Sequence, residues 1–408
     1  MRRAYLALLL PVLWGCRDGS PTALAATRNA ADTATGEYEV VRLPTLPVAP
    51  SSAGEATAVN ASEQVVGWSG VPGQIVHAFL WQDSVLVDLG TLGGSGSWAQ
   101  SINDGGQVAG WSFTASGATH GFVWRDSVLS DLGTLGGDFS KPTGENRAGQ
   151  VVGSSTTASG ATHAFLWQDS TMQDLGTLGG NYSSAAAIND AGQVVGESST
   201  LTGEIHAFLW TGGVMTDLGT LGGTSSSAAA INSGGAVTGV STDSAGVSHA
   251  FRWDAGVITD LGEPPAFSGG RGAVIGPDGS VVGQADSSFL VTHAILWPGD
   301  GSGMQDLGFL YPPRPRTIVH AINHSGQVVG TSIVNGSSSS THAFVWTDGV
   351  MEDLGSLPGI QTFEPSAANA IDAGGDVVGW NGGQGLGSHL PVLWHRLDST
   401  KIASAPVR

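Results

Sequence analysis

The segment His206-Ala207-Phe208-Leu209-Trp210 decides the fold, because it recurs along the chain at a nearly constant step. Eight copies or close variants occur; the first five are 43 residues apart, and the later steps are 44, 49 and 47. A period in the forties indicates one supersecondary unit copied along an array. The histidines that begin the copies are His77, His120, His163, His206, His249, His293, His342 and His389.

One unit of the array predicts four short strands, at residues 185–189, 193–196, 206–210 and 214–219. Turns rich in Gly, Asn and Asp separate them, and no helical period is present, so the unit is all-β. Four strands in about 43 residues are typical of a β-propeller blade, and we expect them to run from the channel outward in this order. A β-solenoid and a seven-bladed propeller are the alternatives.

The two ends of the array favour a closed ring of eight blades. Residues 41–47 match the Asp-Leu-Gly-Thr-Leu-Gly-Gly phrase that follows most copies, with Arg42 in the place of Asp. The last copy ends at Trp394 without that phrase. The N-terminus therefore carries one strand too many and the C-terminus one too few. We expect residues 38–44 to complete the eighth blade, which removes two exposed sheet edges.

The first residues indicate export. Arg2 and Arg3 precede an apolar run, residues 4–14, that is too short to cross a bilayer as a mature helix. The run ends at Leu13-Trp14-Gly15-Cys16, which resembles the lipobox of bacterial lipoproteins. That resemblance implies that Cys16 is lipidated and becomes the mature N-terminus. We expect a lipid-anchored protein of the cell envelope or surface, with a secreted protein as the alternative.

Four regions follow from these readings. We expect a lipoprotein signal peptide at residues 1–16, a flexible tether at 17–36, the eight-repeat propeller at 37–398 and a C-terminal tail at 399–408. Cys16 is the only cysteine, which excludes an intrachain disulfide. We expect a monomer whose only contact with a membrane is its lipid anchor.

The His-Ala-Phe-Leu-Trp and Asp-Leu-Gly-Thr-Leu-Gly-Gly segments recur together at the same spacing. In this the chain resembles the HAF-repeat family of bacterial extracellular proteins, which is named for His-Ala-Phe. The resemblance covers nearly everything from Tyr38 to Trp394. It implies an exported repeat protein, and it supplies no catalytic residue. The last copy departs most, because Leu390-Pro391-Val392 stands in the place of Ala-Phe-Leu.

Charge and motifs narrow the function. The formal net charge of -19 makes nucleic acid an unfavourable partner, because an acidic surface repels phosphate. The Gly-rich linkers open no helix that could hold a phosphate group, and no linear catalytic motif is present. From the sequence we therefore expect no cofactor and no enzymatic activity.

The repeated histidines are expected to be structural. Equivalent residues of a propeller lie far apart around the ring, so the eight histidines do not form a metal site, and we expect no metal elsewhere. Each histidine is expected to make a hydrogen bond with an aspartate on the next strand of its blade. These aspartates are Asp88, Asp131, Asp174, Asp217, Asp260, Asp306 and Asp353.

Positions that differ between blades are the candidates for function. The residue after Val-Val-Gly is Trp68, Trp111 or Trp380 in three blades that become neighbours when the ring closes, and Trp98 precedes the second blade's turn. Clustered aromatic side chains bind sugar rings or anchor a protein partner, although tryptophans also fill gaps between repeats. Glu145 takes an inner position that is Ile or Val in most blades, so it is expected to face the channel or to be paired.

Together these features predict a non-catalytic module that binds a polysaccharide or a surface protein. Two alternatives stay open. One is a secreted propeller enzyme that acts on a polymer through carboxylates in its channel, and the other is an architectural surface component.

Overall fold

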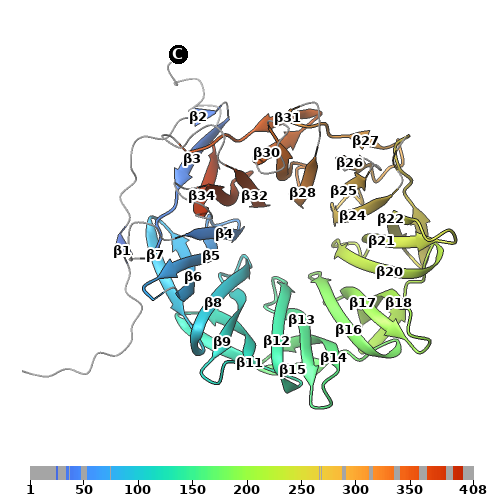
Figure 1. The fold of residues 1–408 in the computed structure, drawn as a ribbon, viewed down its shortest axis with the longest axis horizontal. Helices are drawn as coiled ribbons and strands as arrows, with labels where there is room; N and C mark the ends of the chain where they lie inside the picture. The colour runs from blue at the N-terminus through green and yellow to red at the C-terminus, as the bar shows by residue number, and fades with distance from the viewer. Residues whose placement is uncertain are drawn as a thin grey trace, which may run out of the picture.

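The computed structural model describes residues 24–25, 34–35, 37–46, 53–73, 75–265, 267, 269–286, 291–311, 316–334, 341–357, 365–382 and 389–397. These residues form a ring of eight β-sheets around a central axis, with no helix among them (Figure 1). The predicted signal peptide, Cys16 and the C-terminal tail lie outside the described residues.

Each sheet is a blade of antiparallel strands, and in the first seven blades these strands follow one another in sequence order. The first four blades consist of β4 (Gly54–Val59), β5 (Val65–Val71), β6 (Ile75–Gln82) and β7 (Val85–Gly90); β8 (Gly93–Ile102), β9 (Val108–Thr114), β10 (Thr119–Arg125) and β11 (Val128–Gly133); β12 (Gly136–Glu145), β13 (Val151–Thr157), β14 (Thr162–Gln168) and β15 (Thr171–Asp174); and β16 (Gly179–Ile188), β17 (Val194–Thr200), β18 (Ile205–Thr211) and β19 (Val214–Asp217).

The other blades repeat this pattern, and in Figure 1 the first strand of each blade lies nearest the axis, as expected. They consist of β20 (Gly222–Ile231), β21 (Val237–Asp243), β22 (Ser248–Asp254) and β23 (Val257–Asp260); β24 (Gly270–Ile275), β25 (Val281–Asp286), β26 (Thr292–Trp297) and β27 (Gln305–Asp306); β28 (Thr317–Ile322), β29 (Val328–Ile333), β30 (Thr341–Thr347) and β31 (Val350–Asp353); and β32 (Ser366–Ile371), β33 (Val377–Gly382), β34 (His389–Arg396) and β3 (Tyr38–Arg42).

The N-terminal strand closes the ring. β3 pairs antiparallel with β34, with Tyr38 opposite Arg396 and Arg42 opposite Val392. The side chain of Tyr38 is 1% exposed, and it shares a core cluster with Trp394, which is fully buried. The predicted closure of an eight-bladed propeller is confirmed. Two short strands, β1 (Leu24–Ala25) and β2 (Ala34–Thr35), fall in the predicted tether and pair with β7 and β3.

The hydrophobic core consists of layers between neighbouring blades. In one layer Phe208 and Trp210 of the fourth blade pack with Ala164 and Leu166 of the third. Alternate residues of a strand point to opposite faces, so each His-Ala-Phe-Leu-Trp strand presents Phe and Trp to one neighbour and Ala and Leu to the other. Large side chains thus face small ones at each junction.

A belt of asparagine side chains joins the blades near one end of the channel. The amide of Asn146 donates to the carbonyl oxygen of Asn189 in the next blade at 3.1 Å. Its Oδ1 also accepts from the backbone N–H of Gln150, so one side chain holds both its own turn and the neighbouring blade. The expected Asn-Gly hairpin turns are confirmed, and their role between blades is new. The other inter-blade donors of this belt are Asn60, Asn103, Asn189, Asn232 and Asn323.

Candidate functional site

The turns between the first and second strands of the blades surround a cavity of about 270 Å³ at one end of the channel. Because equivalent turns come from successive blades, residues far apart in the sequence meet here. Side chains that line the cavity belong to Val59, Asn60, Ala61, Ile102, Asn103, Asp104, Glu145, Asn146, Arg147, Ile188, Asp190, His324, Asp372 and Ala373.

Glu145 is the most perturbed carboxyl group of this cavity. It ends β12, and its Oε1 accepts a hydrogen bond from Ser101 at 2.8 Å while its Oε2 accepts one from Gln107 at 3.0 Å. Burial raises the pKa of Glu145 to about 7, although these hydrogen bonds and one from the backbone of Ala109 oppose the rise. Glu145 is therefore hydrogen-bonded to Ser101 and Gln107 and also lines the cavity of the channel, as the sequence predicts.

A row of charged side chains rims the cavity beside Glu145. The Nε of Arg147 lies 3.2 Å from Oδ2 of Asp104 and 3.8 Å from Oδ2 of Asp190, in the blades on either side. Asp190 Oδ1 also accepts a hydrogen bond from the backbone N–H of Arg147 at 3.0 Å. The three groups are well exposed, so their charges are available to a ligand at the cavity.

The opposite side of the cavity is formed by the last two blades. Asp372 occupies the position that is Asn in most blades, and burial together with the charge of Asp376 raises its pKa. His324 lines the cavity as well, whereas Nδ1–H of His320 donates a hydrogen bond to the carbonyl oxygen of Ala368, 2.7 Å away. Burial lowers the pKa of His320, which favours its neutral form.

The four predicted tryptophan site residues are half-buried, and only Trp98 and Trp111 make a ring contact with each other. The rings of Trp98 and Trp111 stack at 4.0 Å between centroids, and Lys141 Nζ lies 5.0 Å from the centroid of Trp111. Trp380 stacks instead on His389 at 3.8 Å. Trp68 makes no ring contact within the part of the chain that the structure describes. The structure therefore does not gather the tryptophans of three blades into one stacked cluster.

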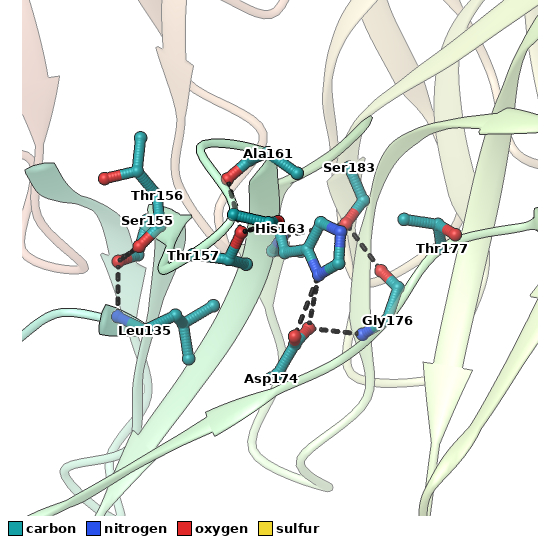
Figure 2. A network of polar contacts seen from close by, with 12 residues as sticks. Leu135, Ser155, Thr156, Thr157, Ala161, His163, Asp174, Gly176, Thr177 and Ser183 are labelled. Carbon is teal, nitrogen blue, oxygen red and sulfur yellow. Dashed lines mark hydrogen bonds and ion pairs between the residues drawn. The ribbon is translucent and has the colours of Figure 1, made fainter. Parts of the chain in front are cut away.

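The repeated His–Asp pairs are blade-internal contacts, as expected. His163 Nδ1 lies 2.8 Å from Oδ2 of Asp174, whose Oδ1 accepts from the backbone N–H of Gly176 (Figure 2). Ser183 of the next blade donates to the carbonyl oxygen of Gly176 and accepts from the backbone N–H of Ala164. The same His–Asp contact is present at His77, His120, His206, His293 and His342.

Two of the eight histidines depart from the pattern. His249 Nδ1 lies 2.8 Å from Oε1 of Glu263 and 3.4 Å from Oδ2 of Asp260. In this blade Glu263 is therefore closer to the histidine than the repeated aspartate is. The assignment of His389 to the repeat is wrong, because Asn381 pairs with Leu390 at the position where six of the other blades pair serine, and the sixth blade Ala285, with the histidine. An extra residue before Trp394 shifts the strand by one position, which turns His389 to the opposite face.

The eighth blade lacks both members of the pair. Leu390 takes the place of the histidine. Arg42 takes the place of the aspartate, because it lies opposite Val392 just as Asp88 of the first blade lies opposite Phe79. The loss of both partners in one blade supports a mutual structural role for the pair elsewhere.

One further group could hold a metal ion. Ligand atoms of Glu63, Asp376 and His395 all lie within 4.8 Å of one another, and no other such group of three or more occurs in the described part of the chain. The sequence led us to expect no metal site, because the members of this group are up to 332 residues apart and come together only through ring closure.

The sequence matches no family of known proteins and no curated protein. Its fold is similar to that of the β-propeller domain of the Trilobed protease from Pyrococcus furiosus, with a TM-score of 0.50, 10% identity and coverage of 76% of this chain and 100% of that one. It is also similar to an oligogalacturonate lyase from Vibrio parahaemolyticus, with a TM-score of 0.51, 9% identity and coverage of 94% and 100%. A puromycin hydrolase variant is similar with a TM-score of 0.50 and 13% identity, and the match covers 83% of this chain and 61% of that one.

These similarities show the fold, and they correct one expectation. The sequence predicted no enzyme because it contains no linear catalytic motif, yet hydrolases and a lyase are among the proteins similar to this chain. The physical reason is that a propeller assembles side chains from separate blades around its channel, so a site leaves no local motif.

No helix in the described residues is long and apolar enough to cross a membrane.

Proposed function

We propose that this protein is an enzyme that acts on a polysaccharide at the channel cavity, with Glu145 as the group that transfers the proton. The observation that carries the proposal is the carboxyl group of Glu145, held by two side chains of the neighbouring blade where other blades place Ile or Val. A buried carboxyl group at a purely structural junction would be unfavourable compared with the usual Ile.

The acidity of Glu145 suits this role. A pKa of about 7 leaves a large share of the carboxyl group protonated at neutral pH, where it can donate to a leaving oxygen and then accept a proton from water. Cleavage of a glycosidic bond needs a second carboxylate. Asp104 and Asp190 line the same cavity, and both lie within ion-pair distance of Arg147, which holds them in place.

The charge of the cavity favours a neutral polymer. Four carboxyl groups and one arginine line it, so a polyanionic chain would be repelled while the carboxylates can accept hydrogen bonds from sugar hydroxyls. The stacked Trp98 and Trp111 lie in the second blade, next to β12, which carries Lys141 and Glu145. Lys141 and Glu145 lie opposite Ser154 and Val151 of β13, three residues or about 10 Å apart, so one sugar chain can contact the aromatic pair and Glu145 together.

The test is a depolymerisation screen with neutral polysaccharides, using residues 17–408 and measuring the release of reducing ends. We expect activity in the parent protein and a loss of at least 100-fold in Glu145→Gln, which keeps the shape and hydrogen-bonding capacity of the side chain. Glu204→Gln is the matched control, because Glu204 is exposed on a loop of the fourth blade. Full activity in Glu145→Gln, or no activity of the parent on any substrate, would overturn the proposal.

We also propose that the enzyme is exported and anchored through a lipid on Cys16, as a member of the HAF-repeat group. The basic residues, the short apolar run and the single cysteine at the end of that run support this. Metabolic labelling with a radioactive fatty acid should mark the parent protein in the membrane fraction. Cys16→Ser should be unlabelled and remain in the soluble fraction; equal labelling would show that the lipid is elsewhere.

A further inference from the structure

Three side chains with metal-ligating chemistry meet where the ring closes, outside the cavity just described. Glu63 lies in the turn between β4 and β5 of the first blade, Asp376 in the turn between β32 and β33 of the eighth, and His395 near the end of β34. Asp376 is only 5% exposed, and its Oδ2 lies 3.0 Å from Nδ1 of His395. Two blades thus contribute to one group.

No other junction carries a metal ligand at more than one of the three equivalent positions. Where the second blade meets the third, Gln107 approaches Gly149: a Cβ on this glycine would lie 2.9 Å from the Oε1 of Gln107. Within the first blade, Gln64 donates to Gln82, the residue that corresponds to His395. A glycine stands in the place of Glu63 at all seven other junctions, and a glutamine stands in the place of Asp376 at five of them.

At the closing junction all three positions change together. Asp376 replaces the glutamine, His395 replaces a residue such as Gln82 or Gln168, and Glu63 replaces the glycine. Aspartate is one methylene shorter than glutamine, which leaves space for the side chain at residue 63. The residues that correspond to Glu63 in the seven other blades are Gly106, Gly149, Gly192, Gly235, Gly279, Gly326 and Gly375.

The backbone at Glu63 makes this substitution unfavourable for the turn alone. Its φ is 55°, in the left-handed region where a residue other than glycine costs about 1–2 kcal/mol. Among the described residues the Glu63 carboxylate has no hydrogen-bond or ion-pair partner, and Arg396 pairs with Glu37 instead. A bound cation would give the strained, negatively charged residue a role.

The donor set fits a transition metal. Histidine nitrogen and carboxylate oxygen are both zinc ligands, at about 2.0–2.2 Å from the ion, and three of them leave a fourth tetrahedral position for water. Mg²⁺ and Ca²⁺ prefer oxygen ligands throughout. Ligand atoms on one tetrahedral ion lie about 3.4 Å apart. His395 and Asp376 are already that close, so the exposed Glu63 side chain is the one that has to move inward to complete the site.

We propose that Glu63, Asp376 and His395 bind one Zn²⁺ ion, and that this ion clamps the eighth blade to the first. The ion replaces the proton shared by His395 and Asp376, and it joins two segments that are otherwise linked through β3 and the core between these blades. Binding to the folded ring and not to the unfolded chain stabilises the closed propeller.

The test uses residues 17–408 without a histidine tag, freed of metal by chelation. Titration calorimetry with ZnCl₂ should give one site per chain, and the Tm should rise with Zn²⁺. Glu63→Gly restores the turn residue of the seven other blades, so it should fold at least as well as the parent without metal, yet bind Zn²⁺ at least tenfold more weakly. His395→Gln, which restores the residue type of Gln82, should behave in the same way.

His163→Gln is the matched control, because it removes a ring nitrogen of the repeated His–Asp pairs and leaves the closing junction unchanged. It should keep the parent's stoichiometry and Tm shift. Absence of Zn²⁺ binding by the parent overturns the proposal and leaves only a His395–Asp376 hydrogen bond. Parent-like binding by Glu63→Gly and His395→Gln also overturns it, as does loss of binding in His163→Gln alone.

Discussion

The side-chain amide of Asn103 donates a hydrogen bond to the carbonyl oxygen of Asn146, 3.1 Å away in the neighbouring blade. Asn103 is 9% exposed, so this contact is largely shielded from water. The contact repeats around much of the ring, which makes the turns a second connection between blades beside the hydrophobic layers. It also fixes the positions of Asp104 and Arg147, the residues that follow in these turns at the cavity.

The asparagine belt should contribute measurably to stability. Asn146→Ala removes the donor to Asn189, whose carbonyl oxygen keeps only the bond from the backbone N–H of Gly192, and it removes the acceptor for the backbone N–H of Gln150. We expect the free energy of unfolding to fall by about 2–4 kcal/mol, since each such loss is about 1–2 kcal/mol. Chemical denaturation measures this, with Asn181→Ala at an exposed site as the control. A fall of less than 0.5 kcal/mol would contradict a structural role for the belt.

The closing strand should be essential for the eighth blade. A chain that begins at residue 53 lacks Val40, Leu43 and Leu46, which are at most 2% exposed, and it leaves an edge of β34 unpaired. We expect this chain to aggregate or to exchange strands between molecules, with rapid proteolysis in β32–β34. A chain that begins at residue 37 keeps the strand and should remain monomeric and resistant. Size-exclusion chromatography and limited proteolysis distinguish the two; equal behaviour would show that the closure is dispensable.

Glu145 should make stability depend on pH. Its pKa rises from 4.5 to about 7 on folding, so the folded protein holds the proton more tightly. The stabilising contribution is complete below pH 4.5 and is lost as the pH rises through 7. Relative to Glu145→Gln, the parent should therefore lose up to roughly 3 kcal/mol between pH 4.5 and 8. Urea denaturation across this range measures the difference, and parallel curves for the two proteins would show that the pKa of Glu145 is ordinary.

Much of the fold follows from the period of the sequence, because each repeat must bury both faces of its strands against copies of itself. The His–Asp pairs follow for a related reason: His163 and Asp174 lie on adjacent strands of one blade, eleven residues apart, so local register is enough to predict their contact. Counting from the tryptophan of each copy would also have revealed that Leu390, and not His389, holds the histidine position.

The two sites were harder to predict, because ring closure and blade spacing decide them. Glu63 and Asp376 are distant in sequence, and only the closure by β3 brings their turns together. The local signal was present, since Glu63 stands where seven other turns have glycine. For Glu145 the unusual residue was recognisable, but its hydrogen bonds to Ser101 and Gln107 depend on how far apart the second and third blades lie.

The two tryptophan stacks should separate ligand binding from packing. Trp98→Ala removes the ring stacked on Trp111, and Trp380→Ala removes the ring stacked on His389, so each should lower the free energy of unfolding by about 1–3 kcal/mol. Only Trp98 lies in the blade next to Glu145. In a Glu145→Gln background, which binds without turnover, Trp98→Ala should weaken polysaccharide affinity at least tenfold and Trp380→Ala should leave it unchanged. Calorimetry measures both, and equal affinities in the two variants would make the Trp98–Trp111 pair a packing element that takes no part in substrate binding.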